Sequence, residues 1–253
     1  LLEYAKNLKL LNTYVDGIQS RMQYGVIRPS FLQHGTTSGR YSSRNPNFQN
    51  LPRKDKRIKG CITARSGCVF VGADYSQLEP RVFASYSNDK RLLECFKNGD
   101  DFYSVIGVEV FNKQGMSLKK DDPTSFAEKH KDLRDIAKVV GLSATYGTTA
   151  FKMAPVIKKS TDEAQGVIDD YFSKFPSVQH FMLGCHETAK TKGMVCNLFG
   201  RPRRLPEALG ITQNYGEATH KELPYAVRNI LNLAVNHTIQ STGASIMNRA
   251  AIA

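Results

Sequence analysis

Apolar and polar residues recur with helical spacing along most of the second half of the chain. Apolar side chains three and four residues apart share one face of a helix, so this spacing predicts helices that pack on a common core. Two breaks interrupt the pattern, at residues 119–123 and at Phe175-Pro176. The predicted helical regions are residues 2–22, 80–96, 100–192 with those two breaks, and 224–253.

Strand patterns are fewer. Residues 68–73 (Cys-Val-Phe-Val-Gly-Ala) form a short, partly β-branched apolar run after the turn 65–67, which predicts a strand buried on both faces. It belongs to a strand pair that we expect after the basic run 53–59. Residues 194–206, with an internal Gly-Arg-Pro turn, predict a hairpin. Residues 24–52, rich in Gly, Ser, Thr, Asn and Pro, predict loops and turns. The predicted fold class is α+β with a large helical insertion.

Composition narrows the choice of partners. The chain has 253 residues, of which 41% are hydrophobic, enough for a sizeable core. Lys and Arg number 35 against 23 Asp and Glu, a formal net charge of +12. This balance favours a polyanionic partner such as nucleic acid. A solvated basic surface without a partner is the alternative.

Other features exclude several classes. The five cysteines form no C-x-x-C pair and lack clustered histidines, so we expect reduced thiols rather than a zinc site. No apolar stretch approaches the roughly 18 residues of a membrane span, so we expect no membrane role and a cytoplasmic protein, in a nucleoid or an infected host cell. The chain begins without Met and ends without a helix cap. We therefore expect a fragment or one part of a split protein.

Asp74 follows directly on the predicted strand 68–73. A carboxylate at the mouth of a buried strand is held in place by the sheet behind it. Mg²⁺ prefers one or two such carboxylates together with substrate phosphates. The pattern therefore makes Asp74 a candidate magnesium ligand, and a helix cap or a turn residue is the alternative.

A second set of candidate residues lies in the predicted helix 134–147. Positions 134, 138, 142 and 146 drift by about 40° each and share one face. That face presents Arg134, Lys138, Leu142 and Tyr146 in order. The two cations suit phosphates, and the apolar and aromatic side chains suit a sugar and a base. A solvated basic helix with a packed Tyr is the alternative.

Five sequence blocks, in order, resemble those of the family A DNA polymerases, the group of bacterial DNA polymerase I and many phage replicases. The blocks are residues 36–52, 74–81, 134–147, 197–206 and 236–245. The resemblance implies a right-hand polymerase architecture with a partial palm sheet and a mostly helical fingers insertion. It divides the chain into 1–24 (base of the thumb), 25–90 (first part of the palm), 91–240 (fingers) and 241–253 (start of the returning palm helix).

The resemblance also implies roles for individual residues. Asp74 and Lys138 would be catalytic, and Asp74 with the Tyr75 carbonyl would ligate two Mg²⁺ ions. Glu79 would exclude a ribose 2′-hydroxyl, and Arg134 with Lys138 would hold the triphosphate. Further dNTP contacts would come from Gln77, Leu142 and Tyr146. DNA contacts would come from Arg40, Asn47, Gln49, Asn50, Gly147, Arg201, Arg203, Asn236 and Gln240.

The sequence departs from the family pattern at several positions. Pro80 replaces the commoner Leu, and it favours a helix that begins at Pro80 rather than a capping box from Ser76. Leu142 stands where the family has Phe or Tyr, so discrimination against 3′-deoxy nucleotides is not carried over. Tyr103 stands where many relatives have a phosphate-binding His. Residues 240–241 (Gln-Ser) resemble a phage subset.

The implied function is template-directed DNA synthesis, a Mg²⁺-dependent nucleotidyl transfer from a dNTP to a primer 3′-hydroxyl on primer-template DNA. Two metal ions about 3.5–4 Å apart need more than one carboxylate. The His-Asp-Glu of the family's second carboxylate motif does not occur in these residues. The acidic pairs 100–101, 121–122 and 169–170 are expected to cap helices or to face solvent. We therefore expect a C-terminal polymerase fragment as a partner.

Two other functions compete with this interpretation. A phage-type RNA polymerase would share the basic-Tyr-Gly helix, but Glu79 argues against it. A non-catalytic DNA-binding fragment, or a subunit of a split polymerase, is favoured by the missing second carboxylate.

Overall fold

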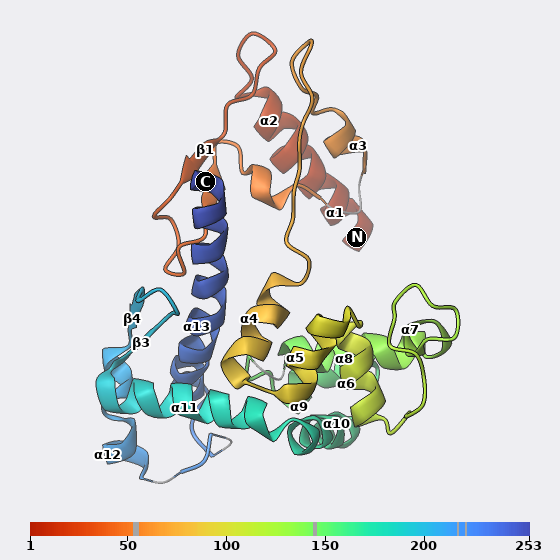
Figure 1. Cartoon of the computed structure of the whole chain (residues 1–253). Helices are drawn as coiled ribbons and strands as arrows, with labels where there is room; N and C mark the ends of the chain where they lie inside the picture. The colour runs from red at the N-terminus through yellow and green to blue at the C-terminus, as the bar shows by residue number, and fades with distance from the viewer. Residues whose placement is uncertain (53–55, 144–145, 217, 221) are drawn as a thin grey trace. The chain divides into compact units, whose positions relative to one another are not determined.

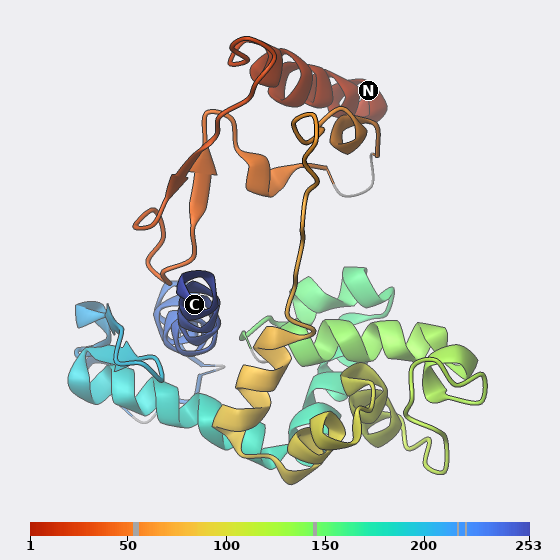
Figure 2. The same cartoon turned by 45° about the horizontal axis from the view of Figure 1, so that its top comes forward.

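The computed structural model describes residues 1–52, 56–143, 146–216, 218–220 and 222–253. It divides into two compact units, Leu1–Ser76 and Gln77–Ala253. Figures 1 and 2 show the elements of each unit. Residues 53–55 of the predicted basic run and residues 144–145 of the predicted block 134–147 lie outside the described residues.

The first unit opens with a continuous helical path. Helix α1 (Leu2–Leu10) runs into a π-helical turn (Leu11–Asp16) and then into α2 (Gly17–Gln19). The predicted helix 2–22 is therefore confirmed, with an end three residues earlier. Tyr14 projects from this path and donates a hydrogen bond to the Asn50 carbonyl at 2.6 Å, which ties the helix to the following loop.

The predicted loop 24–52 contains a small antiparallel hairpin. Strand β1 (Ser30–Leu32) pairs with β2 (Ser42–Arg44), and Phe31 lies opposite Ser43. A 3₁₀ turn (Phe48–Asn50) follows. The buried Ser43 hydroxyl donates to the Pro46 carbonyl and accepts from the Phe48 amide, at 3.3 and 3.2 Å. Polar side chains shape this segment, which explains why an apolar period did not reveal it.

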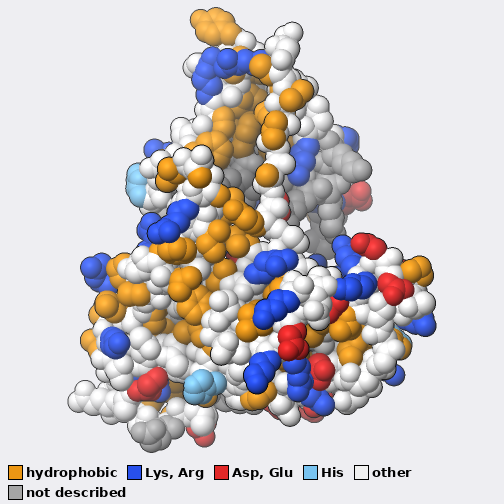
Figure 3. Space-filling model, in the orientation of Figure 1, with side chains coloured by type: hydrophobic (Ala, Val, Ile, Leu, Met, Phe, Trp, Pro, Cys, Tyr) orange, Lys and Arg blue, Asp and Glu red, His pale blue; other side chains and the backbone are white. Residues whose placement is uncertain are grey.

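The prediction of a buried strand at 68–73 is wrong for this structure. A short helix, α3 (Lys56–Gly60), stands where the strand pair was expected to begin. Residues 68–73 form no regular strand, and Val69, Phe70 and Val71 are 82%, 71% and 92% exposed. A strand needs hydrogen bonds from a neighbouring strand, and no described strand pairs with this segment. Other exposed hydrophobic side chains are visible in Figure 3.

The second unit is mostly helical, as predicted. Helix α4 begins at Leu78, two residues before the expected start, so Pro80 lies in its first turn, where a missing N–H costs no helical hydrogen bond. The helices are α4 (Leu78–Ser87), α5 (Lys90–Asn98), α6 (Phe102–Val110), α7 (Phe126–Lys129), α8 (Lys131–Ser143), α9 (Ala150–Ile157), α10 (Thr161–Lys174), α11 (Pro176–Lys192), α12 (Ile211–Tyr215) and α13 (Tyr225–Ile252).

The core of this unit forms where α6 packs against α8 and α10. Phe102, Ile106 and Val140 are fully buried there. Gly141 lets α6 and α8 approach closely, because a Cβ at this position would lie only 2.7 Å from Cδ1 of Ile106. Burial of several large side chains therefore fixes α8, the helix that carries Arg134.

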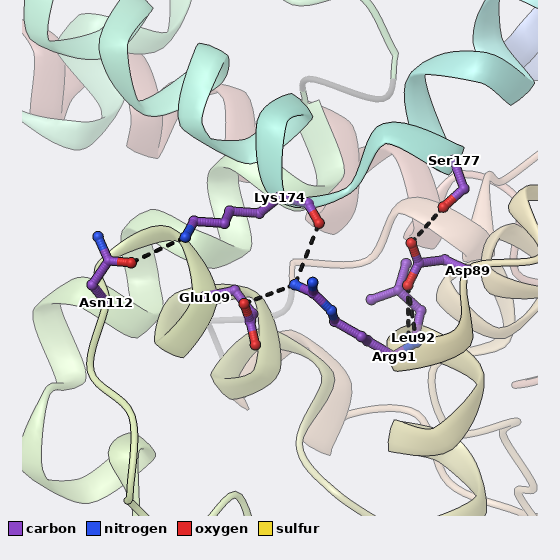
Figure 4. Close-up of polar contacts among 7 residues, drawn as sticks. All are labelled: Asp89, Arg91, Leu92, Glu109, Asn112, Lys174 and Ser177. Atoms are coloured by element: carbon purple, nitrogen blue, oxygen red, sulfur yellow. Dashed lines mark hydrogen bonds and ion pairs between the residues drawn. The ribbon is translucent and has the colours of Figure 1, made fainter.

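Hydrogen-bonded caps join the helices around this core. Asp89 caps α5 and also accepts the Ser177 hydroxyl of α11 at 2.6 Å. Arg91 donates to Glu109 of α6 at 2.8 Å and to the Lys174 carbonyl at the end of α10 at 3.4 Å. Figure 4 shows this network, which links four helices through side chains that are distant in sequence.

The predicted hairpin is confirmed as β3 (Met194–Cys196) paired with β4 (Pro202–Arg204). The buried Asn197 at its turn donates to Ser241 and Ser245 of α13, both at 3.0 Å. Helix α13 buries several polar side chains on this side. Among the described helices, α13 included, none has both the length and the apolar composition of a membrane span.

Candidate functional site

An ion pair at the start of α6 holds Arg134. Asp101 caps α6 and accepts from the backbone and the hydroxyl of Ser104 at 2.9 and 2.7 Å. Arg134 donates from Nε and Nη2 to the two carboxylate oxygens of Asp101, at 2.8 and 2.7 Å. The Asp101 side chain is 1% exposed and the Arg134 side chain 19% exposed. This is the bidentate geometry in which an Arg–carboxylate pair is strongest.

The electrostatics of the pair follow from this geometry. Burial raises the pKa of Asp101, but the hydrogen bonds from Arg134 and Ser104 outweigh burial and hold that pKa below its ordinary value. The Asp101 hydrogen bonds raise the pKa of Arg134 in turn. Both groups are therefore charged at neutral pH. The sequence indicated Asp101 only as a cap, and its partner 33 residues away carried no local signal.

Arg134 and Lys138 both lie beside the ring of Tyr103. The Arg134 guanidinium carbon is 5.6 Å and the Lys138 ammonium nitrogen 5.9 Å from the ring centroid. Tyr103 packs edge-on against Phe102, with ring centroids 5.4 Å apart. The ring face attracts both cations, so the two side chains gather on one side of α8, as the helical spacing predicted.

Tyr146 contacts Glu79. Its hydroxyl donates to Oε2 of Glu79 at 3.1 Å. The helical spacing placed Tyr146 on the same helix as Arg134, but the helix does not extend that far. The described part of α8 ends at Ser143, and Tyr146 lies in a turn with Gly147 at φ +72°. Positive φ favours glycine at this position.

Glu79, Leu142 and Tyr146 line one small pocket over the core. Its free volume is about 10 Å³, room for about one water molecule. The structure thus brings these three predicted residues together around one pocket. Gln77, two residues before Glu79, is the left-handed N-cap residue of α4, at φ +54°.

A second pocket, of about 120 Å³, contains the predicted residues Gly147 and Asn236. Lys152 and Arg228 also line it, and none of the described residues that line it is acidic. Nε of Arg228 is buried without a hydrogen-bond partner among the described residues. The sequence analysis missed both cations, although Arg228 and Asn236 stand eight residues apart and so share a face of α13. The lining is suited to a polar or anionic ligand.

The other basic candidates lie at the hairpin. Arg201 is exposed and Arg203, in β4, is half-buried. The Arg201 amide donates to Asn197 at 2.8 Å, and the Arg201 carbonyl contacts a ring nitrogen of His237 at 3.2 Å. Gln240, half-buried, follows Asn236 by one turn of α13. The hairpin backbone is therefore fixed to α13 while the Arg201 side chain extends into solvent.

In the first unit, the candidate residues Arg40, Asn47, Gln49 and Asn50 are all exposed. Asn47 caps the 3₁₀ turn, because its Oδ1 accepts the Gln49 amide at 3.1 Å. That contact orders the loop and leaves the Gln49 side chain in solvent.

Asp74 and Tyr75 lie in the exposed segment that follows residues 68–73. The expected sheet is not behind Asp74, so the idea that a strand positions its carboxylate is wrong for this structure. A carboxylate and a carbonyl are the oxygen donors that Mg²⁺ takes. Within the described residues, however, no group of three or more His, Cys, Asp and Glu could hold a metal. The donor type fits magnesium, and the donor set is incomplete.

The acidic pairs 100–101, 121–122 and 169–170, which were expected to cap helices or to face solvent, have further contacts besides the Asp101–Arg134 pair. Asp100 pairs with Lys119 at 2.8 Å. Asp122 accepts from the backbone and hydroxyl of Thr124 at 2.8 and 2.7 Å. Asp169 accepts from a Gln165 amide one turn away at 2.8 Å. These contacts order turns and helix surfaces.

Comparison with known proteins covers the whole chain. Residues 1–253 match the model described as DNA polymerase family A. The chain is 32% identical over its full length to DNA polymerase I of Caldicellulosiruptor bescii and 30% identical to the thermostable DNA polymerase I of Thermus aquaticus. It spans 28% of the length of each of these relatives.

A solved structure is also similar. The POL domain of Pol1 from M. smegmatis, in complex with DNA primer-template and dNTP, superposes with a TM-score of 0.75 at 27% identity. The match covers 97% of this chain and 40% of that one.

Proposed function

The chain belongs to DNA polymerase family A, and from that premise we propose that it takes part in template-directed DNA synthesis. The α+β fold class and the polymerase architecture that the sequence predicted are confirmed by the similarity to a polymerase domain. The reaction we propose is nucleotidyl transfer from a dNTP to a primer 3′-hydroxyl. The observation that carries it lies in the second unit, where Arg134 and Lys138 lie beside the Tyr103 ring and the Tyr146 hydroxyl donates to Glu79.

Arg134 and Lys138 are proposed to bind the triphosphate. Phosphoryl transfer depends mainly on positioning and on neutralisation of charge. Asp101 fixes the orientation of the Arg134 guanidinium and offsets part of its charge. Lys138 is exposed, and no described acidic side chain pairs with it. We therefore assign most of the attraction for phosphate, and the catalytic role, to Lys138, with Arg134 as an oriented donor.

Glu79 is proposed to select the sugar. Its carboxylate is held by the Tyr146 hydroxyl, so it does not swing freely into solvent. A carboxylate fixed at the wall of a sugar site would collide with a 2′-hydroxyl and tolerate a 2′-hydrogen. The proposed substrate class is therefore dNTP rather than NTP, with Gln77 and Leu142 beside Glu79 as further substrate contacts.

Asp74 and the Tyr75 carbonyl are proposed as magnesium ligands. Magnesium bound there would neutralise charge that develops on the transferred phosphoryl group. The exposed Asp74 carboxylate can approach such an ion without displacing a buried contact. We propose that a C-terminal polymerase fragment supplies the second carboxylate and the strand partners of residues 68–73.

Primer-template DNA is the proposed partner. Arg40, Asn47, Gln49 and Asn50 offer small polar side chains on an exposed loop, which suit backbone and minor-groove contacts. In the second unit the proposed contacts are Gly147, Arg201, Arg203, Asn236 and Gln240. The net charge of +12 supports binding to a polyanion.

One observation favours a second candidate, a non-catalytic DNA-binding subunit. Among the described residues, Asp74 is the sole acid that matches a catalytic carboxylate motif, and no acidic cluster surrounds it. A chain that grips DNA and dNTP without turnover would need no such cluster.

Primer extension separates the two candidates. The 253-residue chain is incubated with primer-template DNA, dNTPs and Mg²⁺, alone and with a C-terminal segment of a family A relative. We expect extension in the mixture, its loss in Asp74→Ala with DNA affinity unchanged, and normal extension in the control Asp121→Ala. DNA binding with no extension in any mixture would favour the binding subunit. Absence of DNA binding would refute both candidates.

A further inference from the structure

A buried pair of histidines lies where the proposed function does not require one. His186 of α11 stacks on His220, with ring centroids 5.0 Å apart and ring planes 15° from parallel. His186 is 4% exposed, and its Nε2 has no hydrogen-bond partner among the described residues. A buried polar atom without a partner costs free energy. A native protein usually keeps such an unpaired group only where the group has a role, in function or in positioning its neighbours.

His220 connects this pair to α13. Its Nε2 lies 3.0 Å from Oδ1 of Asn232. The amide oxygen can only accept, so His220 donates from Nε2, and the neutral ring carries its proton there. The stack on His186 restricts the plane of the His220 ring, and the ring in turn restricts the Asn232 amide.

Asn232 then meets the turn that carries Tyr146. The side-chain amide of Asn232 lies so close to Gly147 that a Cβ at residue 147 would collide with it. The amides of Tyr146 and Thr148 both donate to the Ser143 carbonyl, at 3.1 and 3.0 Å, which closes the turn around Gly147. A shift of Gly147 would therefore move Tyr146, whose hydroxyl holds Glu79.

We propose that Asn232 is a positioning residue, held by His220 and the stacked His186, that sets the Tyr146–Gly147 turn for the templating base and the incoming nucleotide. The purpose of this positioning rests on the proposed function, and its geometry rests on the contacts of Asn232 with His220 and Gly147. It concerns residues outside the five sequence blocks that resemble the polymerase motifs, with the sole exception of the turn itself.

The surroundings make this connection sensitive to acid. Among the described residues, the charged and titratable groups that face the pair are His180, Glu187 and Lys190 on α11 and Arg228 on α13. Burial lowers the pKa of His186 to about 3, with His220 and Lys190 adding to the shift. Burial also lowers the pKa of His220, against its hydrogen bonds to Asn232 and Arg228. Both rings are neutral at neutral pH, and a proton on His220 would place a cation beside Arg228 and against His186.

Hydrogen exchange in the whole 253-residue chain, without DNA, tests the positioning. In Asn232→Ala we expect the Tyr146 and Thr148 amides to exchange about tenfold faster than in the wild type, because the turn loses its support. Amides of α10 serve as the internal control for folding. The matched variant is Asn229→Ala, which removes the same side chain one turn earlier on α13 from the same pocket. We expect it to leave the turn unchanged. Equal exchange in the wild type and Asn232→Ala would overturn the proposal.

Two His220 variants test the donor. His220→Phe keeps a ring against His186 but cannot donate, whereas His220→Gln keeps a donor. We expect the Phe variant to reproduce the faster exchange of Asn232→Ala and the Gln variant to stay within about twofold of wild type. Wild-type exchange in His220→Phe would overturn the role of the histidine pair.

A DNA measurement then separates this proposal from the proposed function. Primer-template affinity is measured by fluorescence anisotropy for the same variants. We expect Asn232→Ala to bind primer-template about tenfold more weakly than the wild type, because a displaced turn no longer lies in place for the templating base. If the wild-type chain binds no primer-template, the proposed function fails while the exchange data still decide whether Asn232 positions the turn. A loosened turn with unchanged DNA affinity would overturn the assigned purpose.

Discussion

Two regions of the molecule carry the motifs with the strongest chemical signal, and they differ in what holds them. Arg134 lies on α8, where a buried carboxylate, an aromatic ring and a packed core fix it. Asp74 follows an apolar segment whose side chains face solvent. A helix satisfies its own backbone hydrogen bonds, whereas a strand depends on neighbours that come from elsewhere. Residues 1–253 therefore contain what holds the helical motif around Arg134. They do not, within the described residues, contain a strand that pairs with residues 68–73.

The largest expected effect tests this contrast with two phenylalanines. Phe102→Ala in the core should lower the free energy of unfolding by about 3–5 kcal/mol, because it leaves a cavity. Phe70→Ala in the exposed segment should change it by less than about 0.5 kcal/mol. Urea unfolding followed by circular dichroism measures both. A large loss from Phe70→Ala would mean that residues 68–73 are buried in solution.

Breaking the ion pair between Asp101 and Arg134 should also lower the free energy of unfolding, by somewhat less than Phe102→Ala. Asp101→Ala leaves Arg134 without its partner and removes the cap of α6, so we expect a loss of about 3 kcal/mol in unfolding free energy. Asp100→Ala breaks the pair with Lys119, whose side chain is half exposed, and should cost less than about 1 kcal/mol. Equal losses in the two variants would contradict a structural role for the Asp101 pair.

Acid should destabilise the second unit through His186. Burial lowers the pKa of His186 from its ordinary value to about 3, so the folded state disfavours the proton that the unfolded state takes up. Stability from this group is present above the ordinary pKa and falls as the pH drops below it toward about 3. The slope from one such group is at most about 1.4 kcal/mol per pH unit. His186→Leu should flatten the curve between pH 6 and 4, measured by urea unfolding; an unchanged slope would place the acid response elsewhere.

The smallest expected effect concerns Glu79. Tyr146→Phe removes the hydrogen bond to Glu79, which is worth about 1 kcal/mol. In a chain active with its C-terminal segment, the ratio of NTP to dNTP incorporation should rise about fivefold. Tyr86→Phe, which removes a hydroxyl bonded to Thr242 instead, is the control. A rise of the same size in the control would show that the effect is general loosening.

Particular residues show how far sequence reasoning reached. The helices of the second unit and the hairpin at 194–206 followed from local periodicity and turn chemistry, and the structure contains them. Arg134 and Lys138 share a side because 3.6-residue spacing places them there. The pairing of Asp101 with Arg134 could not be predicted, since it depends on how α6 and α8 pack.

The misses have a common origin. The hairpin β1–β2 rests on hydrogen bonds of Ser43, which leave no apolar pattern. Residues 68–73 have the composition of a buried strand, yet composition does not supply a neighbouring strand. Asn232 and His220 are ordinary polar residues in the sequence, and no local pattern indicates their contacts with Gly147 and His186.

The sequence by itself determined the helices, the hairpin turn, the basic charge and the five motif blocks that carry the family resemblance. Each of these features depends on residues a few positions apart or on residue type alone, and both are properties of the local sequence. Tertiary structure decided which residues meet: Asp101 with Arg134, Tyr146 with Glu79, and Asn232 with Gly147. It also decided that residues 68–73 are exposed, because burial and strand pairing are properties of neighbours that the local sequence does not contain.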